Sequence, residues 1–403
     1  MSHIVVIGAG QAGASVTAKL RNLGFDGKLT LIGEEPQPPY QRPPLSKAYL
    51  MGDMALERLF LRPEQFYADQ GIDLMLGQPV SGIDAAARTV SVGGQTLTYD
   101  DLVLTTGSQP RRLPATIGGA LEGVHTVRTL ADIDAFAPGV AAGRHVLVIG
   151  GGYIGLEAAA VAAKKGMKVT LVEMAQRILG RVAAPETSDY FRALHRSHGV
   201  EILEGVGLER LLGEGRVTGA KLSDGREISI DMAIVGVGIT PSVALAEMAG
   251  VALENGIQTD AKGRTSDPAI WSAGDCASFP WRGQRIRLES VQNAIDQAEL
   301  VAENLMGAGK DYTPHPWFWS DQYDVKLQIA GLNTGFDRVV VRAGDKQGAT
   351  SHWYFGQDRL LAVDAMNDPR AYMVGKRLIE AGRSPVPAMI ADPAQDLKEL
   401  LKP

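Results

Sequence analysis

Residues 4–13 read IVVIGAGQAG, and residues 146–155 read VLVIGGGYIG. Each segment is a run of four apolar residues that favour a strand, followed by the spacing G-x-G-x-x-G. Each then continues into a stretch that favours a helix, residues 14–23 in the first copy and 156–165 in the second. A strand, a glycine turn and a helix in this order are typical of a dinucleotide-binding β-α-β unit. The sequence therefore predicts two such units in one chain.

The three glycines of each motif have separate physical tasks. The first forms the tight turn, the second lets backbone N–H groups reach a pyrophosphate at the helix N-terminus, and the third allows close packing of helix on strand. These glycines are Gly8, Gly10 and Gly13 in the first unit, and Gly150, Gly152 and Gly155 in the second. An acid also ends the next apolar run of each unit, Glu34 and Glu173, near the spacing of about 20 residues at which a carboxylate accepts from ribose hydroxyls.

The composition limits the class of protein. The 403 residues predict two or three domains. A single cysteine excludes an intramolecular disulfide, a cysteine-only zinc site and a two-cysteine redox centre. A net charge of −6 argues against a strongly cationic nucleic-acid binder, and the seven histidines form no H-x-x-H pattern that would indicate a metal site.

No membrane segment is expected. The longest apolar stretch, residues 145–163, contains three consecutive glycines and Glu157, which disfavour a transmembrane helix. The N-terminus has no cationic region before its apolar run and does not read as a signal peptide. We therefore expect a cytoplasmic protein.

Further elements follow along the chain. Residues 102–107, 233–241 and 270–277 predict buried strands that end in small-residue turns, and residues 291–306 predict a helix. Short alternating runs between residues 322 and 363 predict an antiparallel sheet. A short helix is expected over residues 392–401.

Taken together, these motifs resemble the FAD-dependent pyridine nucleotide-disulfide oxidoreductase superfamily. The resemblance lies in the two glycine motifs, in T-T-G at 105–107, in G-V-G-I-T-P at 236–241 and in A-G-D at 273–275. The segments YQRPPLSK at 40–47 and PWFWSDQY at 316–323 are similar to those of the NADH-dependent ferredoxin reductases that serve bacterial oxygenases.

The resemblance implies an α/β fold. Two Rossmann-like nucleotide-binding domains, one for FAD and one for NAD in a glutathione-reductase-like arrangement, would be joined by a C-terminal α+β domain. The implied FAD-binding domain is discontinuous, residues 1–108 and 243–319. The NADH-binding domain would span residues 109–242, and the C-terminal interface domain residues 320–403.

The resemblance also assigns cofactor contacts. Besides the glycines of the first motif, the implied FAD contacts are Ala12, Glu34, Arg42, Lys47, Val80, Thr106, Gly107, Arg128, Asp275 and Val291. The implied NADH contacts are the second glycine motif, Tyr153, Ile154, Glu173 and Gly238. Asp275 would accept from a ribityl hydroxyl; a helix-capping or turn aspartate is the alternative. For Glu34 the alternative is a solvated turn with Glu35.

Three residues are expected to act in catalysis. The resemblance puts Lys47 beside the flavin, where a cation stabilises negative charge on the reduced ring; the alternative is a surface lysine after the Pro43-Pro44 turn. It puts Glu157 near the nicotinamide, paired with Lys47; the alternative is a first-turn acid that answers the helix dipole. Trp319 is expected at the flavin edge that a ferredoxin approaches, and the alternative is packing between domains.

The implied electron route follows from the missing cysteines. Disulfide reductases of the superfamily carry C-x-x-x-x-C where this chain has Arg42 to Lys47, and Cys276 lies elsewhere, as a small packed residue. Electrons would therefore leave from the flavin itself, one at a time, to a 2Fe-2S ferredoxin. Glu173 predicts NADH rather than NADPH, with Arg177 four positions later leaving that preference open.

The partner is expected to dock near the flavin on a basic patch. The candidates are Arg62, Arg282, Arg285, Arg287 and Lys326, and a solvated charged loop is the alternative. The chain is expected to be a monomer or a weak dimer. The terminal enzyme is expected to be a cytochrome P450 type monooxygenase, with a Rieske dioxygenase open. Two other functions also stay open: a flavin NADH oxidase, and an interaction protein resembling apoptosis-inducing factor.

Overall fold

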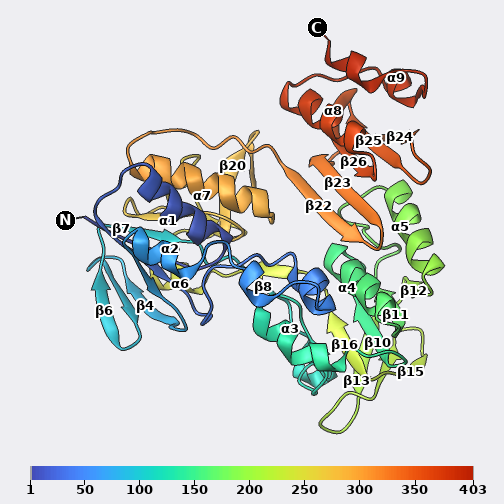
Figure 1. Ribbon diagram of the computed structural model, residues 1–403, viewed down its shortest axis with the longest axis horizontal. Helices are drawn as coiled ribbons and strands as arrows, with labels where there is room; N and C mark the ends of the chain where they lie inside the picture. The colour runs from blue at the N-terminus through green and yellow to red at the C-terminus, as the bar shows by residue number, and fades with distance from the viewer. Residues whose placement is uncertain (1, 403) are drawn as a thin grey trace. The chain divides into compact units, whose positions relative to one another are not determined.

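The computed structural model describes residues 2–402, and the contacts within it divide the chain into two units (Figure 1). The first unit comprises the described residues up to Arg42, Met54–Gln109 and Ile239–Pro314. The second comprises Pro43–Asp53, Pro110–Gly238 and the described residues from His315 onward. Within residues 2–402, no helix is both long enough and apolar enough to cross a bilayer.

A parallel sheet forms the centre of the first unit. Its strand order is β19-β7-β1-β2-β3. The strands are β1 (His3–Ile7), β2 (Lys28–Ile32), β3 (Ile72–Met75), β7 (Asp101–Leu104) and β19 (Ile270–Ser272). Helices α1 (Gln11–Asn22) and α7 (Val291–Leu305) pack side by side against it, as Figure 1 shows. All of β1 is buried, as expected for a parallel strand covered on both faces.

The second unit repeats this plan. Its parallel sheet has the order β12-β11-β10-β16-β9, so the strand before the glycine motif is again central. The strands are β9 (Val124–His125), β10 (His145–Ile149), β11 (Lys168–Glu173), β12 (Glu201–Glu204) and β16 (Met232–Val235). The helices are α3 (Leu130–Phe136), α4 (Tyr153–Lys164) and α5 (Pro185–Ser197).

The repetition extends to polar contacts that the sequence did not suggest. Nε2 of His3 lies 2.9 Å from the Thr30 hydroxyl on the next strand, and Nε2 of His145 lies 2.9 Å from the Thr170 hydroxyl. An aspartate accepts from the backbone N–H of each histidine at 2.7 Å. Both sheets are therefore held by the same contacts at the edge where β1 and β10 begin.

An antiparallel sheet and two helices form the C-terminal part of the second unit (Figure 1, orange and red). The strand order is β22-β23-β26-β25-β24. The elements are β22 (Trp317–Gln322), β23 (Val325–Gly331), β24 (Arg338–Ala343), β25 (Thr350–Gly356), β26 (Arg359–Met366), α8 (Pro369–Glu380) and α9 (Pro387–Ala391). Trp353, Val363 and Leu378 are fully buried in its core. The sheet is longer at both ends than the predicted range of 322–363.

The tail differs from the prediction of a helix from residue 392. A 3-10 turn begins only at Leu397, after Asp396, whose side chain caps it by accepting from the Lys398 N–H. Leu397 and Leu400 are buried, so the predicted apolar face is present over a shorter element.

Smaller elements complete the two units. In the first they are α2 (Glu64–Asp69), α6 (Ala244–Met248), β4 (Val80–Asp84), β5 (Thr89–Val92), β6 (Gln95–Thr98), β18 (Ile257–Gln258), β20 (Ala277–Trp281) and β21 (Gln284–Ile286). In the second they are β13 (Leu208–Leu212), β14 (Gly219–Leu222) and β15 (Glu227–Ser229). Strands β8 (Ser108–Pro110) and β17 (Ile239–Pro241) lie where the chain passes between the units.

The predicted fold class, an α/β protein with two Rossmann-like sheets and a C-terminal α+β part, is confirmed. The three-domain boundaries given above stay a prediction. The contacts group residues 110–238 with the C-terminal part, and they also assign Pro43–Asp53 to the second unit.

Candidate functional site

The first glycine motif leads into the N-terminus of α1 and leaves open space at one of its three glycines. Gly8 has φ +114°, and a Cβ atom there would lie 2.2 Å from the Thr105 carbonyl oxygen. A Cβ at Gly13 would lie 2.0 Å from the Gly8 carbonyl oxygen, whereas a Cβ at Gly10 would meet no atom within 4 Å. Gly8 and Gly13 are thus required by the fold, and Gly10 is the position that faces open space.

The second motif has the same construction at the N-terminus of α4. Gly150 has φ +104°, and a Cβ there would lie 2.4 Å from the Gly236 carbonyl oxygen. A Cβ at Gly155 would lie 2.0 Å from the Gly150 carbonyl oxygen, and a Cβ at Gly152 would again meet nothing within 4 Å. Helix N-termini with open, glycine-lined approaches suit the pyrophosphate of a dinucleotide.

The two acids at the ends of β2 and β11 differ in how they are held. Glu34 is exposed. Both oxygens of Glu173 accept backbone hydrogen bonds, from Gly151 N–H at 2.7 Å and from Ala175 N–H at 2.8 Å. The Glu173 carboxylate is therefore fixed beside the second glycine loop before any ribose binds.

Arg177, whose charge left the nucleotide preference open, is directed elsewhere. Its Nη1 donates to the Ser188 hydroxyl at 2.6 Å, and its Nη2 lies 3.4 Å from the Gly180 carbonyl oxygen. Gly238 has φ +103°, and a Cβ there would lie 3.8 Å from Nη2 of Arg181. Ile154 is 46% exposed on the first turn of α4.

Asp275 lies just beyond β19, next to the first glycine loop. The Ser108 hydroxyl donates to its Oδ2 at 2.9 Å. Gly274 has φ +84°, and a Cβ there would lie 3.1 Å from the Cβ of Ala12, so the A-G-D turn packs directly on α1. Val291 begins α7 after the capping residue Ser290. The A-G-D turn thus lies against Ala12 of the first glycine loop and Ala294 near the start of α7, and Ser108 binds its aspartate.

Other residues implied for FAD lie at strand ends and turns. The Thr106 hydroxyl donates to the Ser242 carbonyl oxygen at 2.7 Å, and Gly107 has φ +67°. Arg42 forms an ion pair with Glu35 at 2.6 Å, and Val80 begins β4. Arg128 lies in the second unit, where its backbone N–H donates to Asp132 before α3.

The residues of the first unit fit a bound FAD. The open space at Gly10, the exposed acid after β2 and the carboxylate of Asp275 at the A-G-D turn supply a pyrophosphate cradle, a ribose acceptor and an acceptor for a further hydroxyl. Those residues would hold the group.

Lys47 reaches the second unit on a short segment of its own. The chain leaves the first unit after Arg42, contributes Pro43–Asp53 to the second, and returns at Met54. A short helical segment, Leu45–Tyr49, which is kinked at Lys47, packs against α4 there. The Tyr49 hydroxyl donates to Asp134, and Nζ of Lys165 donates to the Met51 carbonyl oxygen at 3.0 Å. This segment, residues 43–53, is called the strap below.

The strap brings Lys47 to Glu157. Nζ of Lys47 lies 2.9 Å from Oε1 of Glu157, on the second turn of α4, and 3.6 Å from Oδ2 of Asp321 on β22. Burial raises the pKa of Glu157, while the charge of Lys47 and hydrogen bonds from Lys47 and Ser320 act in the opposite direction. The structure thus contains the pair that the resemblance implied.

Aromatic residues of β22 surround the start of α4. The rings of Tyr153 and Phe318 lie 5.0 Å apart, and Trp317 and Trp319 lie 5.5 Å apart. Among the described residues the buried Tyr153 hydroxyl has no hydrogen-bond partner, and burial raises its pKa. Trp319 is half-buried, so part of its indole is accessible.

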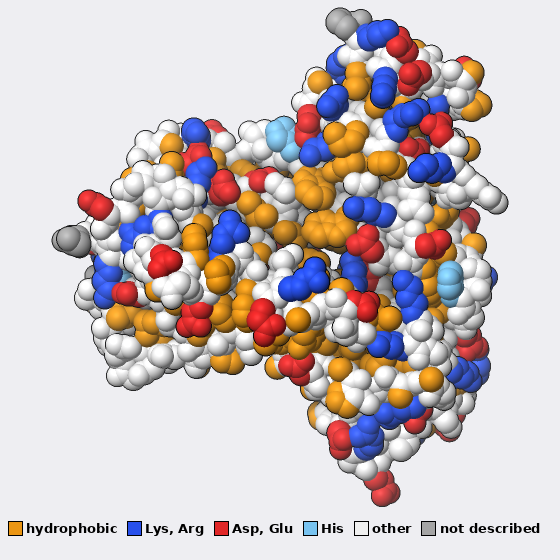
Figure 2. All heavy atoms as spheres, in the orientation of Figure 1, with side chains coloured by type: hydrophobic (Ala, Val, Ile, Leu, Met, Phe, Trp, Pro, Cys, Tyr) orange, Lys and Arg blue, Asp and Glu red, His pale blue; other side chains and the backbone are white. Residues whose placement is uncertain are grey.

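The candidate basic residues fall into two kinds. Arg285 donates to the carbonyls of Thr259 and Ser278 and pairs with Glu254, and Arg287 pairs with Glu289. Arg62, Arg282 and Lys326 are exposed. On the face drawn in Figure 2, cationic and anionic side chains are interspersed rather than gathered by sign.

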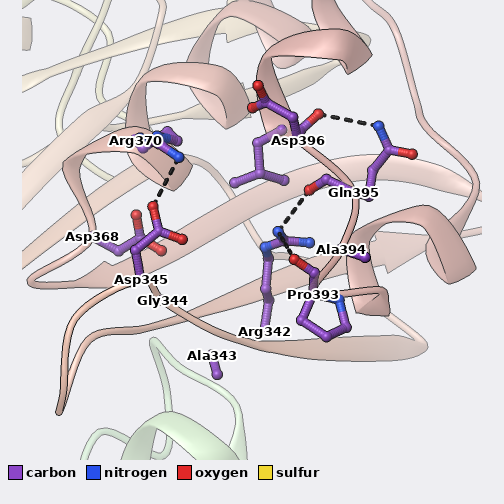
Figure 3. A pocket seen from close by; sticks show the side chains of 11 residues that line it. Arg342, Ala343, Gly344, Asp345, Asp368, Arg370, Pro393, Ala394, Gln395 and Asp396 are labelled. Carbon is purple, nitrogen blue, oxygen red and sulfur yellow. Dashed lines mark hydrogen bonds and ion pairs between the residues drawn. The ribbon is translucent and has the colours of Figure 1, made fainter.

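A pocket in the C-terminal part lies outside these residues. Figure 3 shows Arg342 pointing toward the tail, where its guanidinium donates to the carbonyls of Asp392 and Gln395 at 2.6 and 2.8 Å. Arg370 pairs with Asp345 across the pocket at 2.8 Å. The Arg342 contacts anchor the tail to β24.

Four polar residues around Glu157 were not singled out from the sequence. They are His195, Ser320, Asp321 and Gln322. The last three lie in the segment quoted for its resemblance, and alternation along β22 assigns Ser320 and Gln322 to one face. That alternation was the available signal. Their contacts with Glu157 on α4 and His195 on α5 depend on the tertiary fold, which the sequence pattern does not show.

Comparisons with known proteins agree with this construction. The family model described as pyridine nucleotide-disulphide oxidoreductase matches residues 2–298, and the model described as reductase C-terminal matches residues 317–401. A ferredoxin–NAD(P)+ reductase of Sphingomonas sp is 44% identical to the chain over 406 aligned positions, which cover 99% of this chain and 98% of that protein.

Two solved structures resemble the chain over its whole length. The ferredoxin reductase for the CYP199A2 system from Rhodopseudomonas palustris has a TM-score of 0.96 and 40% identity, with 100% of both chains covered. The putidaredoxin reductase in its covalent complex with putidaredoxin has a TM-score of 0.95 and 39% identity, covering 99% of this chain and 98% of that one.

Proposed function

The chain belongs to the pyridine nucleotide-disulphide oxidoreductase family, and we propose that it is an FAD-containing NADH:ferredoxin reductase. In this proposal it takes electrons from NADH and passes them singly to a 2Fe-2S ferredoxin. That ferredoxin supplies an oxygenase, a monooxygenase of the cytochrome P450 type. The names and titles of the relatives support the class of acceptor.

One observation supports the choice of acceptor above the others. Cys276 is the only cysteine of the chain, it is fully buried, and its Sγ lies 3.6 Å from the Leu104 carbonyl oxygen. A dithiol that could relay electrons to a disulfide substrate is absent from the sequence. With FAD held by the first unit, electrons would pass to an external acceptor without a dithiol relay, and an iron–sulfur protein suits acceptance of one electron at a time.

Bound FAD would supply the redox chemistry, acceptance of a hydride and release of single electrons. The residues of the chain bind and orient. The loop around Gly152 and the fixed Glu173 carboxylate receive the pyrophosphate and adenosine ribose of the nucleotide. Lys47 and Glu157 form an ion pair close to the start of α4, where the rings of Tyr153 and Phe318 also pack together.

The proposed preference for NADH rests on Glu173 and Arg177. A carboxylate already held by two backbone amides accepts from a 2′-hydroxyl and repels a 2′-phosphate. The guanidinium of Arg177 donates to Ser188 and is directed away from that role.

Exposed cations support docking of an acidic ferredoxin. Arg62 and Lys326 remain as patch residues, together with Arg282, whereas Arg285 and Arg287 bind backbone carbonyls and carboxylates of their own unit. The proposal therefore narrows the basic patch to its exposed members and keeps Trp319 as the residue at the flavin edge.

The test uses the purified flavoprotein. Reduction by NADH and by NADPH is followed in the flavin absorbance, and cytochrome c reduction is measured with and without a panel of 2Fe-2S ferredoxins from monooxygenase and dioxygenase systems. We expect rapid reduction by NADH and strong stimulation by monooxygenase-type ferredoxins. Rapid flavin reduction without stimulation by any ferredoxin would contradict the proposal. Fast turnover with oxygen alone would indicate an NADH oxidase instead.

A further inference from the structure

Glu157 lies at the end of a row of buried polar side chains from two other elements. The Ser320 hydroxyl on β22 donates to Oε1 of Glu157 at 2.7 Å, and Nε2 of Gln322 donates to the Ser320 oxygen at 3.1 Å. Nε2 of His195 on α5 lies 2.8 Å from Oε1 of Gln322. Ser320, Gln322 and His195 are all fully buried.

The chemistry of these groups gives the row one direction. Glu157 as a carboxylate only accepts, so the single proton of Ser320 points toward it. Gln322 must then offer its amide N–H to Ser320, which leaves its carbonyl oxygen for His195. A carbonyl oxygen only accepts, so Nε2 of His195 carries a proton. Every donor in the row therefore points toward Glu157.

His195 is suited to hold that direction. Burial lowers the pKa of His195 to about 4, so the ring is neutral at neutral pH. With Nε2 protonated, Nδ1 is an acceptor, and the Tyr323 hydroxyl lies 3.4 Å from it. The other charged groups near Glu157 are Lys47 and Asp321.

The row is more than packing. Burying four polar side chains costs free energy that apolar residues of similar size would not incur, and their mutual hydrogen bonds offset it. A buried polar row in place of an apolar core therefore points to a role at the group where it ends. The second donor to Glu157, Lys47, comes from the strap, whose flanking residues belong to the first unit. Ser320 is the donor that α4 receives from the C-terminal sheet.

We propose that Gln322 and His195 are positioning residues for the NADH half of the reaction. Acting through Ser320, they hold the Glu157 carboxylate in its pair with Lys47 while the nicotinamide binds. The C-terminal part, through β22, thus takes part in flavin reduction as well as in contact with a ferredoxin. This inference rests on the proposed function.

The first experiment separates the two half-reactions. Flavin reduction by NADH and reoxidation of dithionite-reduced protein by ferricyanide are followed by stopped flow. We expect Gln322→Leu and His195→Leu to slow flavin reduction about tenfold, because the Ser320 proton loses its fixed direction. Reoxidation stays at the wild-type rate. His195→Gln, which keeps an N–H near the Nε2 position, recovers most of the loss.

Matched controls guard against general damage. His145→Gln changes another histidine of the same unit, at the start of β10, whose Nε2 contacts the Thr170 hydroxyl. We expect it to leave both half-reactions unchanged. If Gln322→Leu does not fold, Ser320→Ala and Ser320→Thr make the same comparison, because only threonine keeps the hydroxyl. Equal slowing of both half-reactions, or full activity in Ser320→Ala, would overturn the proposal.

The second readout does not depend on turnover. In protein labelled with ¹⁵N-histidine, the His195 signals, assigned with His195→Gln, should report a neutral ring protonated at Nε2 from about pH 6 to pH 9. A ring protonated at Nδ1, or a charged ring, would contradict the row. If no ferredoxin accepts electrons, the proposed function fails, yet flavin reduction and the ¹⁵N signals still decide this inference.

Discussion

Nζ of Lys47 lies 2.9 Å from Oε1 of Glu157, whose side chain is only 5% exposed. The two residues come from segments far apart in the sequence, the strap and α4. Their dependence on each other is unequal. Without Glu157, Lys47 would still have the carboxylate of Asp321 at 3.6 Å. Without Lys47, the buried Glu157 would lose the cation that it pairs with.

Lys47→Met should therefore destabilise the protein more than Glu157→Gln. Burial already raises the pKa of Glu157, and loss of Lys47 raises it further. When the pKa of a carboxyl is higher in the folded state than in the unfolded state, the protein loses stability as pH rises through the folded-state pKa. We expect Lys47→Met to lose about 3 kcal/mol at neutral pH and less in acid. Thermal unfolding measured across pH checks this, with Lys28→Met, from an exposed pair with Asp73, as the control.

Gly152→Ala should weaken nucleotide binding without disturbing the fold. A Cβ at Gly152 meets no protein atom within 4 Å, so the methyl group would project into the space that receives the pyrophosphate. We expect a folded, yellow protein whose affinity for NADH falls at least about tenfold. Gly155→Ala is the contrasting variant, because its Cβ would lie 2.0 Å from the Gly150 carbonyl oxygen and should impair folding. Flavin content, Tm and NADH titration distinguish the two.

Glu173→Ala should weaken the choice between NADH and NADPH. The wild-type carboxylate accepts from Gly151 and Ala175, so its charge is held where a 2′-substituent would lie. We expect kcat/KM for NADH to fall about tenfold and the NADH/NADPH ratio to fall with it. Glu34→Ala, at the matching position of the first unit, should reduce FAD retention and leave the ratio unchanged. An unchanged ratio in Glu173→Ala would contradict the assignment.

The glycine loops were predictable from their spacing, and the close approach at the third glycine of each motif is a local steric requirement. A side chain at Gly13 would collide with the Gly8 carbonyl of the same loop, a contact that the spacing reports, whereas a side chain at Gly8 would collide with the Thr105 carbonyl just after β7. The same holds for Gly150 and Gly155. The partners of Gly8 and Gly150 follow β7 and β16, which neighbour β1 and β10 in the sheets but lie far along the chain, so the motif alone does not identify them.

The environment of Glu157 was only partly predictable. Its pairing with Lys47 came from resemblance, since nothing in residues 43–53 indicates that this segment leaves one unit for the other. Ser320 and Gln322 share a strand face by alternation, yet their contact with His195 depends on how β22 meets α5. Likewise, the charge of Arg285 suggested a surface patch, whereas its guanidinium donates to the backbone carbonyls of Thr259 and of Ser278 on the neighbouring strand β20. Such contacts are properties of tertiary packing.

The free energy of unfolding should fall as pH rises from about 4 to about 6, because Asp364 has a raised pKa in the folded protein. It is fully buried where β26 faces α5, and the hydroxyls of Thr187 and Tyr354 donate to its Oδ2. Burial raises its pKa from 3.8 to about 6, so the folded protein keeps a proton that the unfolded chain has lost in this range. Relative to Asp364→Asn, the wild type should lose about 3 kcal/mol over that range. The free energy of unfolding of both proteins is measured across this pH range. A constant difference between wild type and Asp364→Asn would contradict the assignment.

The exposed and the inward-directed arginines and lysines should respond differently to charge reversal. Lys326 and Arg62 are exposed, so Lys326→Glu and Arg62→Glu should leave Tm within about 1 °C of the wild-type value and weaken ferredoxin binding. Arg285 is 19% exposed and binds two carbonyls and Glu254, so Arg285→Glu should lower Tm instead.

Charge complementarity acts mainly on association, so the KM for ferredoxin of Lys326→Glu and Arg62→Glu should rise several-fold at low salt and approach wild type at high salt. Ferricyanide reduction, which needs no docking surface, is the control and should stay unchanged. If Arg285→Glu alone raised the KM for ferredoxin at unchanged Tm, the docking surface would lie on the hairpin of β20 and β21 rather than at Arg62 and Lys326.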